Sequence, residues 1–308
     1  MKVSVHTHAD CLGHEPGPGH PESPSRLKAV LQALDDPSCA VTERHDAPLA
    51  TREQLARVHD AGMLDMVFAA APAQGQVFLD ADTAMSSHSL EAALRAAGAV
   101  CSAIDGVFAG PQRRAFCAVR PPGHHATHDT AMGFCLFNNV AIGAVHALAV
   151  HGIERVAIID FDVHHGNGTA DIFRADPRVL YASTHQSPLY PGSGAPSQRG
   201  LGNLVHVPLA AGAGSPEFRA AFETRILPEL EKFAPQLVVV SAGFDAHRLD
   251  PLANLNLDAD DFAWVTRQLV AVAERHAAGR LVSALEGGYS LNALHESTIA
   301  HVNALSAH

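Results

Sequence analysis

Short apolar runs, many of them β-branched, alternate along the chain with longer segments in which apolar residues recur every three or four positions. The short runs predict buried strands, and the longer segments predict amphipathic helices. Strands are predicted at 3–6, 115–119, 155–159, 179–183, 204–207, 237–241 and 281–285. Fully apolar strands that alternate with helices are typical of parallel sheets covered on both faces. The pattern therefore predicts an α/β fold, an open and mostly parallel sheet between two helical layers.

Three segments carry clear helical spacing of their apolar residues: 90–108, 218–233 and 262–276. Ser215 followed by Pro216 is a start signal for the second segment, and Asp258 with Asp261 is a start signal for the third. Pro228 lies inside the second segment, where its missing N–H and its ring predict a kink.

Two segments, 13–21 and 187–202, are too rich in proline and glycine to form a helix or a central strand. Patterned segments continue directly on both sides of each, so neither is typical of a linker between domains. The chain contains no repeat of 20–50 residues. The sequence therefore predicts one domain over residues 1–308.

Composition narrows the class of protein further. Hydrophobic residues make up 47% and charged residues 17% of the 308, which excludes intrinsic disorder. The formal net charge is −11, and no block of Lys and Arg suggests a nucleic-acid partner. No apolar run approaches the ~20 residues of a membrane helix, and residues 1–6 lack the apolar core of a secretory signal. Five cysteines without CxxC spacing indicate a reducing compartment. We expect a cytoplasmic protein with no membrane partner.

Polar residues follow four of the predicted strands. Strand 115–119 runs into RPPGHH, 155–159 into DFDVHHGNG, 237–241 into AGFD, and 281–285 into EGGY. Parallel sheets bind their ligands at the carboxyl ends of the strands. Glycine accompanies the polar residues in each case, which permits close approach of the backbone. The sequence therefore predicts one functional site at this edge of the sheet.

Asp162, His164 and Asp245 form the first candidate constellation. Asp162 and His164 alternate at a strand end, so both side chains can point to one side of the sheet. Three protein ligands leave an open position for water or substrate, as in catalytic metal sites. Two carboxylates and one imidazole suit Zn²⁺ or Fe²⁺. The alternative is a hydrogen-bonded Asp–His network with a structural role.

His124 and His125 supply candidate acid–base groups at the same edge, although paired histidines elsewhere are often structural. Asp160 and Asn167 can hold the outer nitrogens of these histidines. Tyr289 can donate a hydrogen bond to a developing oxyanion. Together with a metal these groups describe hydrolysis of a carbonyl compound. No Walker lysine motif, GxSxG or HExxH offers a competing chemistry.

Five ordered motifs resemble the zinc-dependent histone deacetylase superfamily. They are RPPGHHA at 120–126, GFCLFNN at 133–139, DFDVHHGNG at 160–168, SAGFDAHRLDPL at 241–252 and LEGGYS at 285–290. HPESPSRL at 20–27 and DTAMSSHSLEAA at 82–93 are similar to its N-terminal signatures. The resemblance is greatest to the class II branch and its bacterial deacetylase-like and acetylpolyamine-amidohydrolase-like relatives. It implies an arginase/deacetylase-like α/β/α fold.

The resemblance also implies roles for individual residues. One zinc ion per subunit is expected on Asp162, His164 and Asp245. His124 and His125 are the implied active-site histidines, the second acting as general base and then general acid, with Tyr289 on the oxyanion. Further implied residues are Gly133, Phe134 and Tyr190 in an acyl-lysine tunnel, and Asp160, Asp162, His164, Ser183 and Thr184 around a potassium ion. Asn167 departs from the class I pattern, which has an aspartate there.

The implied reaction is removal of an acetyl or other acyl group from a lysine side chain of a protein or peptide. The alternative substrate is an acetylated small amine such as an acetylpolyamine. Leu252 matches a tunnel-mouth gatekeeper that is acidic in polyamine-selective relatives, and its lack of charge favours lysine. Two rivals are a catalytically silent binder of acylated ligands and an arginase-like dimanganese hydrolase. The second rival needs a second cluster of Asp and His ligands, and the sequence shows only one cluster in all. The oligomeric state stays open.

Overall fold

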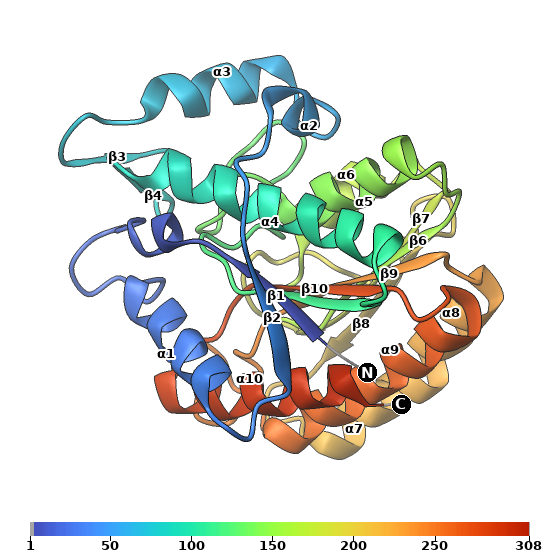
Figure 1. Ribbon diagram of the computed structural model, residues 1–308. Coiled ribbons are helices and arrows are strands. Elements are labelled where there is room, and N and C mark those ends of the chain that lie inside the picture. Colours follow the sequence, from blue (N-terminus) through green and yellow to red (C-terminus); the bar gives the residue numbers. More distant parts are fainter. Residues whose placement is uncertain (1–2, 308) are drawn as a thin grey trace.

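An eight-stranded sheet forms the centre of the computed structural model, which describes residues 3–307 (Figure 1). The strand order is β2-β1-β5-β10-β9-β6-β7-β8, and every neighbouring pair is parallel. The strands are β1 Val3–Thr7, β2 Val41–Asp46, β5 Arg114–Cys117, β6 Val156–Asp160, β7 Val179–Gln186, β8 Leu204–Leu209, β9 Leu237–Ala242 and β10 Leu281–Leu285. Met1 and Lys2, part of the N-terminal stretch considered above, and His308 lie outside the described residues.

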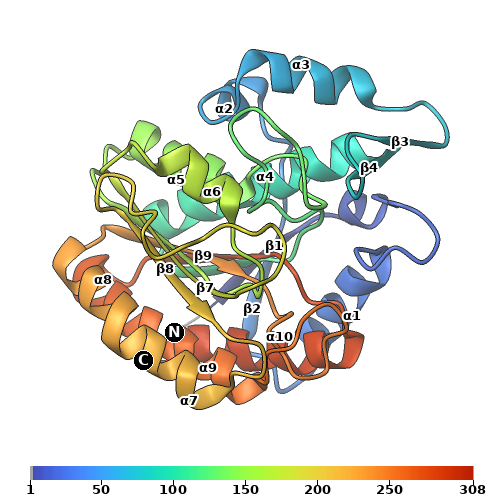
Figure 2. The same ribbon diagram turned by 180° about the vertical axis from the view of Figure 1, so that it is seen from behind.

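Helices cover both faces of the sheet (Figures 1 and 2). One face carries α4 Ser89–Ala109, α5 Asn139–Val150 and α6 Asn167–Phe173, and the other carries α1 Pro24–Asp35, α7 Ser215–Ala221, α8 Leu227–Phe233, α9 Ala259–His276 and α10 Leu291–Ser306. The remaining elements are a 3₁₀ turn at Ala9–Leu12, α2 Arg52–Ala56, α3 Ala61–Ala70 and a hairpin of β3 Gln76–Phe78 with β4 Ala84–Ser86. The predicted three-layer α/β/α arrangement is confirmed.

The helix signals in the sequence have the expected structural effects. Asp258 caps α9, and together with Asp261 it forms a capping box that satisfies N–H groups of the first turn. Pro228 lies in the first turn of α8, directly after a π-helical turn at Phe222–Ile226 that separates α8 from α7. The helical run therefore widens into a π-helical turn just before Pro228, the residue at which the sequence predicted a kink.

One expectation from hydropathy was wrong. The helix α4 is long and apolar enough to cross a membrane, by length and composition alone. Most of its apolar window is buried inside the protein, where the helix packs on β1, β5 and β10 and against α5. A core helix that is covered on several sides has the same composition.

The sequence did not indicate β2, the β3–β4 hairpin, or the helices α1, α2, α3, α5, α6 and α10. The physical reason is clear for two of these elements. Strand β2 is an edge strand of sequence VTERHD, whose charged side chains hide the period of two. Helix α5 is almost entirely apolar and buried, so it has no polar face to reveal a helical period. The two segments rich in proline and glycine contain no helix or strand, as predicted.

Strands β5, β10, β9 and β6 are consecutive neighbours in the sheet. They are the four strands that the sequence predicted to end in polar residues. Because they are parallel, their carboxyl ends lie at one edge, and the loops that follow them converge there.

Candidate active site and metal centre

The three predicted metal ligands lie together at this edge. Asp162 and His164 follow β6, and Asp245 follows β9, its neighbour in the sheet. His164 Nδ1 is 3.1 Å from Asp162 Oδ1 and 3.1 Å from Asp245 Oδ2. The candidate ligand atoms all lie within 4.8 Å of one another, and all three residues are buried. The side chains are thus placed around one point.

Backbone groups hold the two carboxylates in place. The amide of Gly287 donates to Asp162 Oδ2 at 2.8 Å, and the amide of Val163 donates to Asp245 Oδ1 at 2.8 Å. Asp162 Oδ1 also accepts from the amide of His164 at 2.8 Å. Such bonds orient the oxygens that a metal ion would meet.

The donor set fits a divalent cation. Burial alone lowers the pKa of His164, but hydrogen bonds with Asp162 and Asp245 outweigh it and raise this pKa to about 10. Burial, with the charge of Asp162, raises the pKa of Asp245 to about 7. The contacts of His164 with two carboxylates, and the charge of Asp162 beside Asp245, favour positive charge in the space between the three side chains. Two carboxylates and one imidazole suit Zn²⁺ or Fe²⁺, and three protein ligands leave a position for water or substrate.

Two glycines make room for the ligands. A Cβ atom on Gly287 would lie 2.0 Å from Asp245 Oδ2, and one on Gly243 would lie 2.1 Å from Asp162 Oδ2. Neither distance is compatible with a side chain at these positions unless the ligands move. Glycine is therefore required at 243 and 287 because the backbone there lies in close contact with the carboxylates of Asp162 and Asp245.

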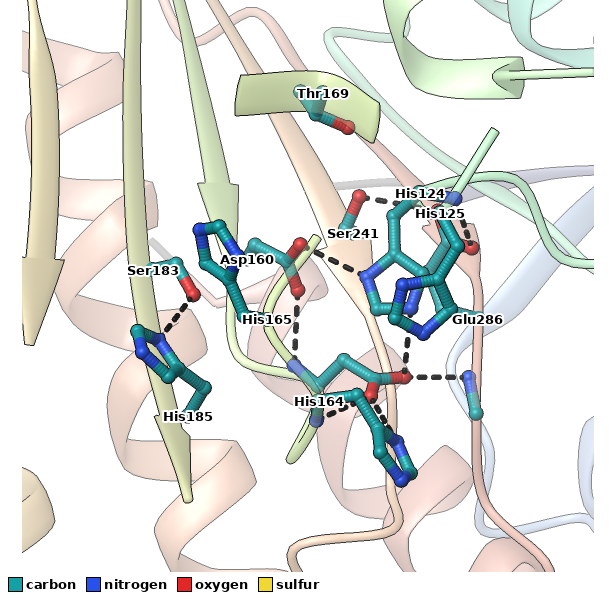
Figure 3. Close-up of polar contacts among 12 residues, drawn as sticks. His124, His125, Asp160, His164, His165, Thr169, Ser183, His185, Ser241 and Glu286 are labelled. Atoms are coloured by element: carbon teal, nitrogen blue, oxygen red, sulfur yellow. Dashed lines mark hydrogen bonds and ion pairs between the residues drawn. The ribbon is translucent and has the colours of Figure 1, made fainter. Parts of the chain in front are cut away.

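His124 faces the carboxylates from the end of β5 (Figure 3). Its Nδ1 is 3.0 Å from Asp160 Oδ2, and its Nε2 is 3.8 Å from Asp162 Oδ2. Burial opposes a charge on this imidazole, but Asp162 and Asp160 together raise its pKa well above the usual range. Tyr181 donates a further bond to Asp160 Oδ2 at 2.9 Å. The pair His124–Asp160 is therefore a buried charge-stabilised unit.

His125 packs beside His124, with ring centroids 4.1 Å apart (Figure 3). Its Nδ1 lies 2.8 Å from Asn167 Oδ1, while Asn167 Nδ2 faces the carbonyl of His125 at 3.4 Å. An amide oxygen only accepts, so Nδ1 carries the hydrogen and Nε2 keeps a free lone pair. Burial, with the neighbouring charge of His124, lowers the pKa of His125 well below its usual value.

Glu286 is a buried site residue to which the sequence assigned no role. Its Oε2 accepts from the amides of Gly123 at 2.7 Å and His124 at 3.2 Å, and its Oε1 accepts from Ser241 Oγ at 3.1 Å (Figure 3). Burial raises the pKa of this carboxyl to about 7. Glu286 ties β10 to the histidine turn and to β9. The LEGGYS motif at 285–290, which contains Glu286, was the feature of the sequence that could have indicated this residue.

A cavity of about 260 Å³ opens above these groups. It is lined by Asp82, His125, Gly133, Phe134, His164, Leu189, Tyr190, Leu252 and Tyr289. The predicted tunnel residues therefore surround one space with the candidate ligand His164 and the candidate base His125. Asp82 and Leu189 are lining residues that the sequence did not indicate.

The wall residue Phe134 has an unusual backbone. Its φ is +67°, in the left-handed region that a bulky residue rarely adopts. Thr83 Oγ1 accepts from the Phe134 amide at 3.1 Å, and this hydroxyl donates to Asp82 Oδ1 at 2.9 Å. Strained residues are found at sites where the surroundings fix them. The loop that contains Asp82 thus fixes the wall.

Tyr289 borders the cavity from the loop after β10. Its amide donates to Asp250 Oδ2 at 2.7 Å, and its ring lies 6.2 Å from that of Phe134. Burial raises the pKa of the phenol well above its usual range, although Arg26 opposes the shift. The phenol keeps its proton and remains a hydrogen-bond donor.

The residues expected around potassium are also buried neighbours. Asp160 and Ser183 are register partners in β6 and β7, and Thr184 follows Ser183. The oxygens of Asp160 already accept from the amide of Asp162 and from Tyr181. Ser183 Oγ is 3.0 Å from His185 Nδ1 (Figure 3). Potassium binding stays a prediction.

A second Asp/His group exists, contrary to the expectation of a single cluster. Asp105 Oδ1 lies 2.8 Å from His146 Nε2 and 2.7 Å from His151 Nε2. Asp105 belongs to α4, His146 to α5, and His151 follows α5, so no member follows a strand. The sequence did not reveal this group because Asp105 and His146 lie on helices, whereas the first group was located by its position at strand ends.

Comparisons with known proteins agree with this geometry. The histone deacetylase domain model matches residues 20–305. The histone deacetylase-like amidohydrolase of Pseudomonas aeruginosa is 42% identical over 303 residues, covering 91% of this chain and 80% of that protein. Histone deacetylase 14, chloroplastic, of Arabidopsis thaliana is 38% identical and covers 98% of this chain and 76% of that protein. The crystal structure of the HDA15 HD domain matches with a TM-score of 0.93 at 34% identity, covering 99% of this chain and 88% of that one.

The first prediction concerns the metal. Asp245→Asn keeps the side-chain size but removes one ligand charge, so zinc bound after dialysis should fall well below one ion per chain. Asp105→Asn makes the same change in the second Asp/His group and should leave the bound zinc unchanged. Elemental analysis of both proteins measures this. If Asp105→Asn lost zinc while Asp245→Asn kept a full ion per chain, the assignment of the metal to Asp162, His164 and Asp245 would be wrong.

The second prediction concerns the space beside the ligands. Gly287→Ala forces Asp245 and Asp162 apart, so zinc affinity should drop by at least about tenfold and stability by about 1–3 kcal/mol. Gly106→Ala, at an exposed position of α4 with no atom within 4 Å, should leave zinc affinity unchanged and stabilise the helix by about 0.5–1 kcal/mol. Zinc titration and thermal unfolding report both effects. Equal zinc affinity in the two variants would contradict the steric argument.

Proposed function

This chain belongs to the histone deacetylase family and is a hydrolase acting on amide bonds, and from that premise we propose that it is a zinc-dependent deacetylase of acyl-lysine side chains. One observation carries the proposal. His164 of the group Asp162–His164–Asp245, the candidate base His125 and the candidate oxyanion donor Tyr289 all line a single cavity of about 260 Å³. These are the parts that hydrolysis of an unactivated amide needs.

The three ligands would hold the zinc ion, which when bound supplies Lewis-acid chemistry: it polarises a carbonyl oxygen and makes water a better nucleophile. His125 Nε2, free because Nδ1 donates to Asn167, takes a proton from the attacking water. The water oxygen then bonds to the acyl carbon. As the carbon–nitrogen bond breaks, His125 returns the proton to the departing amine, and the acid is released.

Two further groups stabilise charge during this sequence. Tyr289 is a protonated phenol at the cavity and donates a hydrogen bond to the carbonyl oxygen as it becomes negative. His124, held by Asp160, lies beside His125 and adds positive charge near the same centre. Asp160 and Asn167 thereby act through the histidines that they orient.

The two rival functions are less well supported. A silent binder of acylated ligands has no need for a buried ligand set together with a base and an oxyanion donor. A dimanganese centre places its ions about 3.5–4 Å apart. The second Asp/His group shares no residue with the first and belongs to α4 and α5, so it does not meet that requirement.

Acyl-lysine is the favoured substrate because the cavity walls are apolar. Phe134, Leu189, Tyr190 and Leu252 match the alkyl stem of lysine, and Leu252 offers no charge to a polyamine. One observation favours the second candidate, an acetylpolyamine: Asp82 also lines the cavity and can attract an internal ammonium group. The two candidates therefore differ in how much they depend on Asp82.

Several attributes remain part of this proposal. They are a single catalytic domain over residues 1–308, one zinc ion per subunit, a potassium ion near Asp160 and Ser183, a cytoplasmic location, and the absence of nucleic-acid and membrane partners. The formal charge of −11 and the lack of a block of Lys and Arg support the expectation that nucleic acid is not a partner.

The third prediction tests the oxyanion donor. Tyr289→Phe keeps the ring and removes one hydroxyl, so kcat on an acetyl-lysine peptide should fall about 10²–10³-fold. Bound zinc and the unfolding midpoint should not change, because the hydroxyl is not a ligand. Tyr190→Phe deletes the other phenolic hydroxyl of the cavity and should cost far less. Near-normal turnover of Tyr289→Phe would remove the residue from the mechanism.

The fourth prediction tests substrate class through kcat/KM for an acetyl-lysine peptide and for acetylputrescine. Wild type should prefer the peptide. Leu252→Glu should shift the preference toward acetylputrescine by about ten- to a hundredfold, since an ammonium–carboxylate contact there is worth about 1–3 kcal/mol. Asp82→Asn should reduce acetylputrescine hydrolysis more than peptide hydrolysis. A wild-type preference for acetylputrescine would overturn the lysine assignment and leave the chemistry unchanged.

A further inference from the structure

A buried ion network lies behind Tyr289, outside the cavity. At its centre Glu22, fully buried, accepts hydrogen bonds from Arg120 through both carboxylate oxygens, the Oε2 bond being 2.6 Å long. Arg26 Nη1 donates to Glu22 Oε1 at 3.1 Å, and His14 Nε2 lies 3.3 Å from Oε2. Both guanidinium groups are fully buried as well. One carboxylate thus serves two buried cations.

Arg26 connects this network to the loop of Tyr289. Its Nε donates to the carbonyl of Gly288 at 2.6 Å, and its Nη2 donates to the carbonyl of Glu286. The guanidinium carbon is 4.7 Å from the centre of the Tyr289 ring. Arg26 therefore hydrogen-bonds to the backbone just before Tyr289 and packs on the Tyr289 ring. Glu22 compensates the positive charge of Arg26.

Arg120 holds a different part of the chain. Its remaining bonds go to the carbonyls of Cys11 at 2.9 Å and His14 at 3.0 Å, both in the N-terminal segment. The histidine turn that follows Arg120 has its own anchors, which are Glu286, Asp160 and Asn167. Loss of Glu22 should therefore affect Tyr289 more than the histidines.

We propose that Glu22 is a positioning residue for the reaction: through Arg26 it holds Tyr289 at the oxyanion position. This inference rests on the proposed deacetylase function. Without the carboxylate, two buried guanidinium groups repel each other and lack a common counter-charge. Arg26 is then expected to shift, and the loop that it grips moves the phenol away from the carbonyl oxygen. A displacement of about 1 Å is enough to lose an oxyanion contact.

A double-mutant cycle separates this role from general stability. Glu22→Gln should lower kcat on an acetyl-lysine peptide by about ten- to a hundredfold with little change in KM or bound zinc. In the Tyr289→Phe background the same substitution should cost no more than about twofold, since the contact that it disturbs is already absent. Equal losses in both backgrounds, or no loss with Tyr289 present, would overturn the proposal.

Asp261→Asn is the matched control. Asp261 is also a buried carboxylate, and it accepts from Arg219 at 2.9 Å, but it belongs to the capping box of α9 and does not line the cavity. The Asp261→Asn substitution should lower the unfolding midpoint and cause the same small change of kcat whether residue 289 is Tyr or Phe. Coupling to Tyr289 as large as that of Glu22 would show that the cycle reports stability alone, and would contradict the proposal.

Glu22→Asp covers the case in which the glutamine variant does not fold. It keeps the charge but shortens the reach, so a smaller loss of kcat, again confined to the background that retains Tyr289, is expected. An equal loss in both backgrounds overturns the proposal here too. Wild-type protein with bound zinc but no amide hydrolysis would instead refute the proposed function, so the two failures are distinguishable.

Discussion

Negative charge buried at one edge of the sheet is the constraint on which the site depends. Asp160, Asp162, Asp245 and Glu286 are each no more than 1% exposed and lie at or just beyond the carboxyl ends of β6, β9 and β10. Carboxylates withdrawn from water need hydrogen-bond donors or cations as compensation. The backbone amides of Gly123, His124, Val163 and Gly287 supply part of it. We propose that positive charge on His124, together with a metal ion held by the three candidate ligands, compensates the remainder.

This requirement explains the local architecture. The carboxylates can approach one another because glycines at 243 and 287 leave no side chain between them. The parallel order β5-β10-β9-β6 brings the four loops to the same edge of the sheet. Next to this edge, Glu22 pairs with both Arg26 and Arg120, and Arg26 in turn donates to the backbone of the Tyr289 loop. The site therefore consists of buried carboxylates at the edge of the sheet, with a second group of buried ion pairs beside them.

The sequence predicted what depends on local pattern and strand topology. Apolar runs located seven of the strands. The rule that parallel sheets bind ligands at the carboxyl ends of their strands then predicted one edge for Asp162, His164, Asp245, His124, His125 and Tyr289. Charged side chains on the edge strand β2, and the lack of a polar face on α5, concealed those elements.

Partners that are distant along the chain could not be predicted in the same way. Glu22 meets Arg120 across 98 residues, and Glu286 meets Gly123 across 163. No periodicity encodes such pairs. Asp82 reaches the cavity because Thr83 anchors the Phe134 amide, a contact between two loops. Local patterns thus locate the chemistry, and long-range contacts determine its supports.

Acetate release measured against metal content tests the central claim most directly. Protein stripped by a strong chelator, then titrated with Zn²⁺, is assayed on an acetyl-lysine peptide while bound zinc is quantified. Activity should vanish with the metal and return in proportion to bound zinc, reaching its plateau at one ion per chain. Full activity in protein shown to be metal-free would contradict the account.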